Sequence, residues 1–155
     1  MKLYLAGPDV FRPDAAVWAE KVRELCHGAG HEALLPMDAG HATAVAIYRN
    51  NLRLLGEADA VLANLNPFRG AEPDSGTCVE IGIALAQGKA VIGYADDLRP
   101  LRERLRAAPG SDGRCRDGTG TAVEDFGLPF NLMLAVPLQL VRGGIDAALV
   151  ALAEP

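Results

Sequence analysis

Two carboxylates, Asp74 and Glu80, stand six residues apart in DAVLANLNPFRGAEPDSGTCVEIGIALAQGKAVIGY, the stretch from 59 to 94. Here an apolar segment runs into a proline- and glycine-rich loop, and a helix is expected to begin at Ser75 with Asp74 as its N-cap. Cleavage of a glycosidic bond with retained configuration uses one carboxylate to attack the sugar and a second group to manage the leaving group's proton. The two acids flank a loop-to-helix junction, so they can converge without sharing a helix face.

Glu80 also has a simpler interpretation. A solvated glutamate near a helix start is favoured by the helix dipole. We expect Val79, Ile83 and Ala86 to face the sheet, which would leave the carboxylate near a strand end with little bulk around it. Its own helix face would then carry small or polar residues, namely Gly76, Thr77, Ala84 and Gln87. The pattern alone leaves the catalytic and the surface interpretation open.

Short, nearly continuous apolar runs predict the strands that must position these acids. They cover residues 3–6, 60–65 and 90–94, with a weaker candidate at 32–35, and each is bounded by Gly, Pro, Asn or Asp. Such runs are typical of parallel strands that are covered on both faces.

Helical patterns fill the gaps between these strands, at residues 14–28, 44–57 and 75–89, where Gly88 supplies a stop. Further helices are expected from about 131 and from about 145. Alternating strands and helices predict an α/β fold with a parallel sheet. We see no boundary within residues 1–155 and expect a single domain.

Composition restricts the class of protein. The chain has a formal net charge of −5 with scattered Lys and Arg, which argues against a nucleic-acid polymer as partner. No apolar run approaches the ~20 residues that span a bilayer, and the apolar N-terminus is too short for a signal peptide. Cys26, Cys78 and Cys115 show no CxxC spacing. We therefore expect a soluble cytoplasmic protein with reduced thiols and no membrane partner.

Four segments, LYLAGP, ADAVLANLNPFRG, DSGTCVEIGIALAQGKAVIGY and FNLML, occur in this order. Together they resemble the nucleoside 2-deoxyribosyltransferase family, and the Asp-x-Gly-Thr-x-x-Glu-hydrophobic-Gly arrangement is the most specific part. The resemblance implies a flavodoxin-like, doubly wound parallel sheet with helices on both faces. It also implies homo-oligomers, small nucleosides and nucleobases as partners, and neither a metal ion nor an organic cofactor.

The resemblance further implies roles for individual residues. Glu80 matches the nucleophile, which attacks C1′ of a 2′-deoxynucleoside and forms a covalent deoxyribosyl ester. Asp74 matches the aspartate that interacts with the base and helps its protonation, and Tyr4 matches the tyrosine that places the nucleophile. Asn131 to Met133 match a segment that a neighbouring subunit donates to hold the 5′-hydroxyl. A second base then attacks the ester, which gives transfer of the sugar.

Further substrate contacts are expected from Asn51, Phe68, Arg69 and Gly76. Many family members have an aspartate where this chain has Asn51, and an asparagine can hydrogen-bond but cannot act as an acid or base. Phe68 could stack on a base or simply anchor its loop. Arg69 could contact a base or phosphate, or be solvated. His41 is a candidate to replace a base-contacting glutamine of some members.

Two alternatives remain open. A nucleoside 5′-monophosphate N-glycosidase would share the fold and the glutamate but needs a phosphate pocket, and Asp9, after the first strand, disfavours one. A nucleotide-sensing module without turnover is the other, since fold alone does not establish catalysis.

Residues 109–121 form a polar segment that we expect to be a surface loop. Its length suggests a lid that excludes water from the ester.

Overall fold

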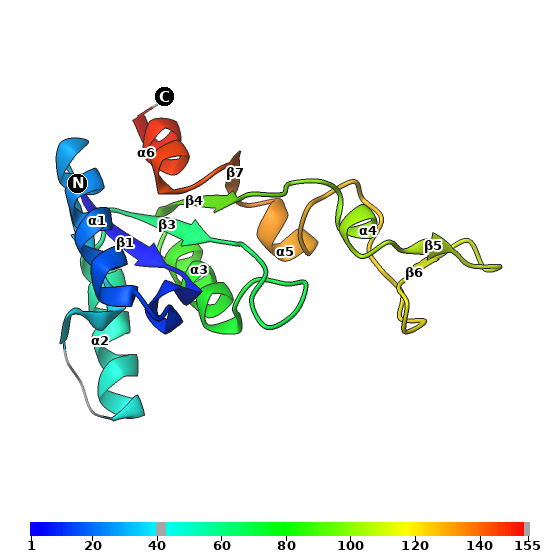
Figure 1. Ribbon diagram of the computed structural model, residues 1–155, viewed down its shortest axis with the longest axis horizontal. Coiled ribbons are helices and arrows are strands. Elements are labelled where there is room, and N and C mark those ends of the chain that lie inside the picture. The colour runs from blue at the N-terminus through cyan, green and yellow to red at the C-terminus, as the bar shows by residue number, and fades with distance from the viewer. Residues whose placement is uncertain (40–42, 154–155) are drawn as a thin grey trace.

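A parallel β-sheet forms the centre of the computed structural model, which describes residues 1–39 and 43–153. Within those residues the sheet has five strands in the order β2-β1-β3-β4-β7 (Figure 1). The strands are β1 (Lys2–Ala6), β2 (Glu32–Leu34), β3 (Ala60–Asn64), β4 (Ala90–Ala95) and β7 (Gln139–Arg142). This is the flavodoxin-like order, whose reversal between β1 and β3 leaves a crevice at the carboxyl ends of the strands.

The strands predicted from apolar runs are confirmed, but β7 was not expected. Its four residues, Gln139–Arg142, are exposed or half-buried because the strand lies at the edge of the sheet beside β4. Four residues with two adjacent apolar side chains between polar ones carry little strand signal.

Helices cover both faces of the sheet. The long ones are α1 (Ala15–Gly28), α2 (Ala44–Glu57), α3 (Ser75–Ala86) and α6 (Ile145–Ala153). Shorter turns are the 3-10 helices η1 (Pro8–Phe11) and η2 (Pro36–Ala39), and the single turns α4 (Leu101–Arg104) and α5 (Leu132–Ala135). Helices α2 and α3 contact each other and β1, whereas α1 contacts α6 on the opposite face. The doubly wound α/β fold expected from the sequence is therefore confirmed.

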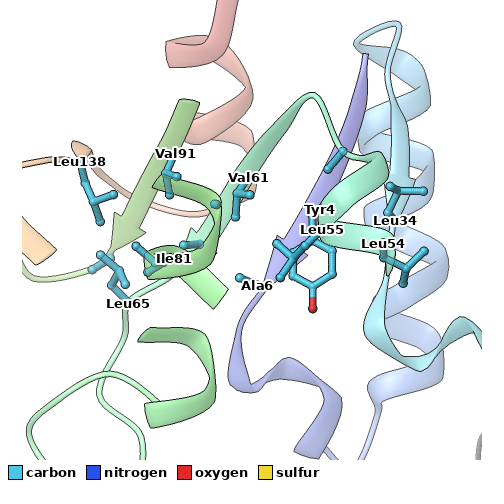
Figure 2. Close-up of a cluster of buried hydrophobic side chains, with 14 of the residues drawn as sticks. Tyr4, Ala6, Leu34, Leu54, Leu55, Val61, Leu65, Ile81, Val91 and Leu138 are labelled. Atoms are coloured by element: carbon cyan, nitrogen blue, oxygen red, sulfur yellow. The ribbon is translucent and has the colours of Figure 1, made fainter. Parts of the chain in front are cut away.

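Strand alternation divides the core into two layers. Tyr4 and Ala6 of β1 lie in the cluster under α2 and α3, while Leu3 and Leu5 lie in the cluster under α1 and α6. Figure 2 shows the Tyr4 ring beside Leu55, with its hydroxyl oxygen pointing out of the apolar cluster. The alternation thus sends the Tyr4 side chain toward α3.

The orientation of α3 differs from the expectation. Thr77, Ile81 and Ala84 are its buried residues, and Val79 is 59% exposed. The apolar residues of α3 are spread around most of its circumference. Their spacing therefore does not identify the face that packs on the sheet. Glu80 lies three residues after Thr77 and four before Ala84, so it shares a helix face with these two buried residues and its side chain borders the side of α3 that packs on the sheet.

Residues 109–121 were expected to form a surface loop, and most of them are exposed. The segment also contains a short antiparallel pairing of β5 (Ala108–Pro109) with β6 (Cys115–Arg116). In Figure 1 this hairpin extends away from the sheet, at the far end of the molecule from α2. In the described part of the chain, no helix is long and apolar enough to cross a membrane.

Candidate active site

Glu80 is held by two side chains from distant parts of the chain. The Tyr4 hydroxyl donates a hydrogen bond of 2.6 Å to Glu80 Oε1, and Asn51 Nδ2 donates one of 3.3 Å to the same oxygen. Tyr4 is completely buried in β1, and Asn51 projects from α2. Glu80 Oε2 receives no hydrogen bond from any described residue. One carboxylate oxygen is therefore fixed and the other is free.

The surroundings of Glu80 raise its pKa. Burial is the largest cause, because it penalises the charged carboxylate. The Tyr4 hydrogen bond lowers the pKa, the negative charge of Asp74 raises it, and the Asn51 hydrogen bond lowers it. Burial, followed by the charge of Glu80, raises the pKa of Tyr4 far above its usual range. Tyr4 therefore stays protonated and acts as a hydrogen-bond donor.

Asp74 caps the N-terminus of α3, as its sequence context predicts. Asp74 Oδ2 accepts hydrogen bonds from the Thr77 backbone N–H at 3.0 Å and from the Thr77 hydroxyl at 3.3 Å. A Cβ on Gly76 would lie 3.0 Å from the same oxygen, so glycine leaves space beside the carboxylate. Within the described residues Asp74 Oδ1 accepts no hydrogen bond and can serve a ligand.

A pocket of about 430 Å³ joins these groups. It is lined by Gly7, Val10, Phe11, Pro36, Met37, Ile47, Asn51, Asp74, Gly76, Thr77 and Glu80. Apolar side chains such as Phe11 and Met37 form its walls, and the carboxylates of Asp74 and Glu80 provide polar groups. The volume suits a small organic ligand, and apolar walls with a few polar groups are usual in such sites.

Several lining residues had not been singled out from the sequence. Gly7, Val10 and Phe11 follow β1, and Pro36 and Met37 follow β2, so the rule that ligands bind beyond the carboxyl ends of strands would have indicated them. Ile47 comes from α2, and no pattern in the sequence marks it.

Phe68 and Arg69 lie behind one wall of the pocket. The Phe68 ring stacks on Phe11, with centroids 5.4 Å apart, and the Arg69 guanidinium lies 4.6 Å from the Phe68 centroid and 5.3 Å from that of Phe11. Phe11 lines the pocket, whereas neither Phe68 nor Arg69 does. In this chain the two residues support Phe11.

Within one chain, Asn131 and Met133 do not line the Glu80 pocket. Asn131 Nδ2 donates to Glu124 Oε1 at 2.7 Å, and its side-chain oxygen accepts from the Met133 backbone N–H at 3.0 Å. Both residues line a separate cavity of about 760 Å³ that Cys78 of α3 also borders. The Met133 side chain is 72% exposed.

The charged residues near the pocket differ in part from the expectation. Asp9 was expected to disfavour a phosphate, but it lines a different cavity on the other face of the sheet. The described lining residues of the Glu80 pocket nevertheless include no Lys, Arg or His. His41, the candidate base contact, lies outside the described residues.

A half-buried carboxylate, hydrogen-bonded by a tyrosine at the carboxyl edge of a doubly wound sheet and open to a small-molecule pocket, defines the candidate active site of an α/β protein. The family model for nucleoside 2-deoxyribosyltransferases matches residues 3–133. This chain belongs to that family.

Two relatives support the assignment. The structure of a 2-deoxyribosyltransferase from Leishmania mexicana superposes with a TM-score of 0.81 at 37% identity, covering 95% of this chain and 93% of that one. An uncharacterized protein of Schizosaccharomyces pombe is 31% identical over 84% of this chain and 74% of its own length. The chain is therefore similar to a deoxyribosyltransferase along nearly its whole length, in one α/β domain.

Proposed function

We propose that this enzyme transfers 2-deoxyribose between nucleobases through a covalent ester on Glu80. The observation that carries the proposal is the asymmetry of this carboxylate, which lines the pocket: Tyr4 and Asn51 both bind Oε1, and Oε2 has no partner among the described residues. A fixed carboxylate with one free oxygen is suited to in-line attack on a sugar carbon.

The reaction has two halves. Glu80 Oε2 attacks C1′, the bond from C1′ to the base nitrogen breaks, and Asp74 helps the departing base to gain a proton. A second base then attacks C1′ of the ester, loses a proton, and releases Glu80 as carboxylate. Since Asp74 Oδ1 has no partner among the described residues, it is available to both leaving and entering base.

The test is chromatography of 2′-deoxyinosine incubated with adenine and the purified protein, beside Glu80→Ala. Formation of 2′-deoxyadenosine by the wild type alone supports transfer and the role of Glu80. Hypoxanthine without the new nucleoside would instead indicate hydrolysis. Mass spectrometry of wild type quenched with donor alone should find one deoxyribosyl group on the peptide that contains Glu80, and its absence would argue against the covalent step.

The monophosphate N-glycosidase alternative is tested with 2′-deoxyinosine 5′-monophosphate in the same assay. The described lining residues supply no cation to a phosphate, so we expect the nucleoside to be the better donor. Preference for the monophosphate would favour the alternative. A sensing module would turn over neither compound.

We also propose that Asn131 to Met133 complete the site of a neighbouring subunit in a homo-oligomer. Support comes from their place in a cavity other than their own Glu80 pocket, from the exposure of Met133 and from the resemblance to the family. Glu80→Ala and Asn131→Ala should each be inactive alone. Co-refolded at equal amounts as dimers, they should regain about one quarter of wild-type activity, because half the dimers are mixed and carry one intact site of two. No recovery in proven mixed dimers would remove this proposal.

We also propose that residues 109–121 act as a lid over the site of a neighbouring subunit, and the hairpin's extension away from its own sheet supports this (Figure 1). Shortening the hairpin should raise the ratio of hydrolysis to transfer. An unchanged ratio would remove the lid hypothesis.

A further inference from the structure

A second cavity, of about 470 Å³, lies on the opposite face of the sheet from Glu80. It is bounded by α1, by the carboxyl ends of β3 and β4, and by the start of α6. None of its described lining residues is shared with the pocket around Glu80. The reaction proposed above makes no use of it.

A polar network of three side chains forms part of this cavity. Asn64 Nδ2 donates a hydrogen bond of 2.8 Å to Asp9 Oδ2, and Asn64 Oδ1 accepts from both the backbone N–H and the Nδ2 of Asn66 at 3.0 Å. Asp9 is only 6% exposed. Each amide nitrogen carries two hydrogens and uses one in these bonds, so the network keeps N–H donors for a ligand in fixed positions.

Tyr94 adds a hydroxyl at the wall of this cavity. Tyr94 lines the cavity and is 5% exposed, and its hydroxyl makes no hydrogen bond to any described residue. A phenol hydroxyl can both donate and accept a hydrogen bond. The cavity is the remaining source of a partner for this group.

The other walls indicate the class of ligand. Trp18 provides a flat aromatic surface from α1. The charged lining residues balance, with Arg12 and Lys21 against Asp9 and Asp146, so the cavity has no net charge to attract an anion or a cation. An aromatic wall, side-chain amides, a carboxylate and a hydroxyl suit a neutral ring that has hydrogen-bonding nitrogen and oxygen atoms at its edge.

We propose that this cavity is a second binding site for a neutral nitrogen heterocycle of the nucleobase type, separate from the catalytic pocket. The 3-10 helix η1 forms a wall of both cavities: Asp9 and the following Arg12 border the second site, and Val10 and Phe11 border the catalytic one. An occupant that binds Asp9 is thus placed to alter the position of Phe11. The binding itself does not depend on the activity proposed above.

Trp18, the single tryptophan of the chain, reports on this cavity by its fluorescence. The intact Glu80→Ala protein is titrated with adenine while its tryptophan is excited on the red edge of the absorption band. Adenine should quench the Trp18 fluorescence, and the quenching should saturate. Tyr94→Phe should weaken this binding by about 3- to 10-fold, the loss typical of one neutral hydrogen bond. Equal affinity in Tyr94→Phe would show that the hydroxyl takes no part and would overturn the proposal.

Leu25→Phe distinguishes the two cavities, because Leu25 lines the second site but not the catalytic pocket, and a larger ring there fills the space. Quenching should be lost in this variant. Val17→Phe is the matched control on the same helix, since Val17 is 67% exposed and does not line the cavity. The proposal is overturned if adenine still quenches Trp18 in Leu25→Phe, or if it does not quench Trp18 in the parent protein. Either result holds whether or not the enzyme transfers deoxyribose.

Discussion

Replacing Tyr4 by phenylalanine tests how the nucleophile is prepared. The change removes a 2.6 Å hydrogen bond to Glu80 Oε1 and keeps the buried ring. That length is typical of a hydroxyl bound to a carboxylate, and a bond to a charged group contributes about 1.5–3 kcal/mol. At 1.36 kcal/mol per pKa unit, its loss should raise the pKa of Glu80 by about 1–2 units. The pKa is already raised by burial, so the carboxylate would then be protonated over a wider range of pH.

The measurement is the pH dependence of kcat/KM for deoxyribosyl transfer. Attack requires the ionised Glu80, so the rate falls as the pH drops through its pKa. In Tyr4→Phe the acidic limb should move upward by about 1–2 pH units, with kcat/KM lower by about 10- to 100-fold on that limb. Tyr48→Phe, at a 58% exposed position of α2, is the matched control and should leave the profile unchanged. An unmoved limb in Tyr4→Phe would refute the idea that this bond holds the carboxylate ionised.

Three further changes have definite expected outcomes. Glu80→Gln should raise the melting temperature at pH 7. Burial raises the pKa of Glu80 in the folded state above its value in the unfolded chain, which is about 4.3. The stability of the wild type therefore falls as the pH rises above that value, and the glutamine variant avoids this loss. The difference in melting temperature between Glu80→Gln and the wild type should shrink as the pH is lowered toward about 4.3. A difference that stays constant across pH would contradict an origin in the pKa of Glu80. Asn51→Asp replaces a hydrogen-bond donor 3.3 Å from Glu80 by a second negative charge, which should raise the pKa of Glu80. The acidic limb of the rate profile should therefore move up by at least about one pH unit. A downward shift would contradict the assigned contact. Gly93→Ala would place a Cβ 2.5 Å from a Leu65 methyl and should reduce the free energy of unfolding by about 1–3 kcal/mol in a denaturant titration. Gly56→Ala, which meets nothing within 4 Å, is its control and should be neutral or stabilising, and equal effects of the two would exclude crowding as the cause.

The local elements of the site follow from the sequence. Asp74 caps α3 because an aspartate before a helical run can bind the free N–H groups of the first turn, and this interaction needs only neighbouring residues. Gly88 lies just beyond α3 with a φ of 71°, a conformation that glycine adopts without steric cost. The apolar runs of β1, β3 and β4 likewise predict buried parallel strands.

The face that α3 presents to the sheet was decided by tertiary packing. Apolar residues occur around most of this helix, so several orientations bury similar area, and contact with the sheet selects Thr77, Ile81 and Ala84. The side of the sheet that Asp9 faces was undetermined for a similar reason, because a turn after a strand can direct a side chain to either face. Its bond to Asn64 appears only once β1 and β3 pair.

The sequence by itself determined the layered α/β fold and supplied Glu80 within a specific motif. Only the tertiary structure brought Tyr4 and Asn51 to one oxygen of Glu80, from 76 and 29 residues away along the chain. Propensities and caps act over a few residues, whereas these contacts depend on the order of strands in the sheet and on how two helices pack over it. The free second oxygen of Glu80, on which the proposed chemistry rests, is a consequence of that packing.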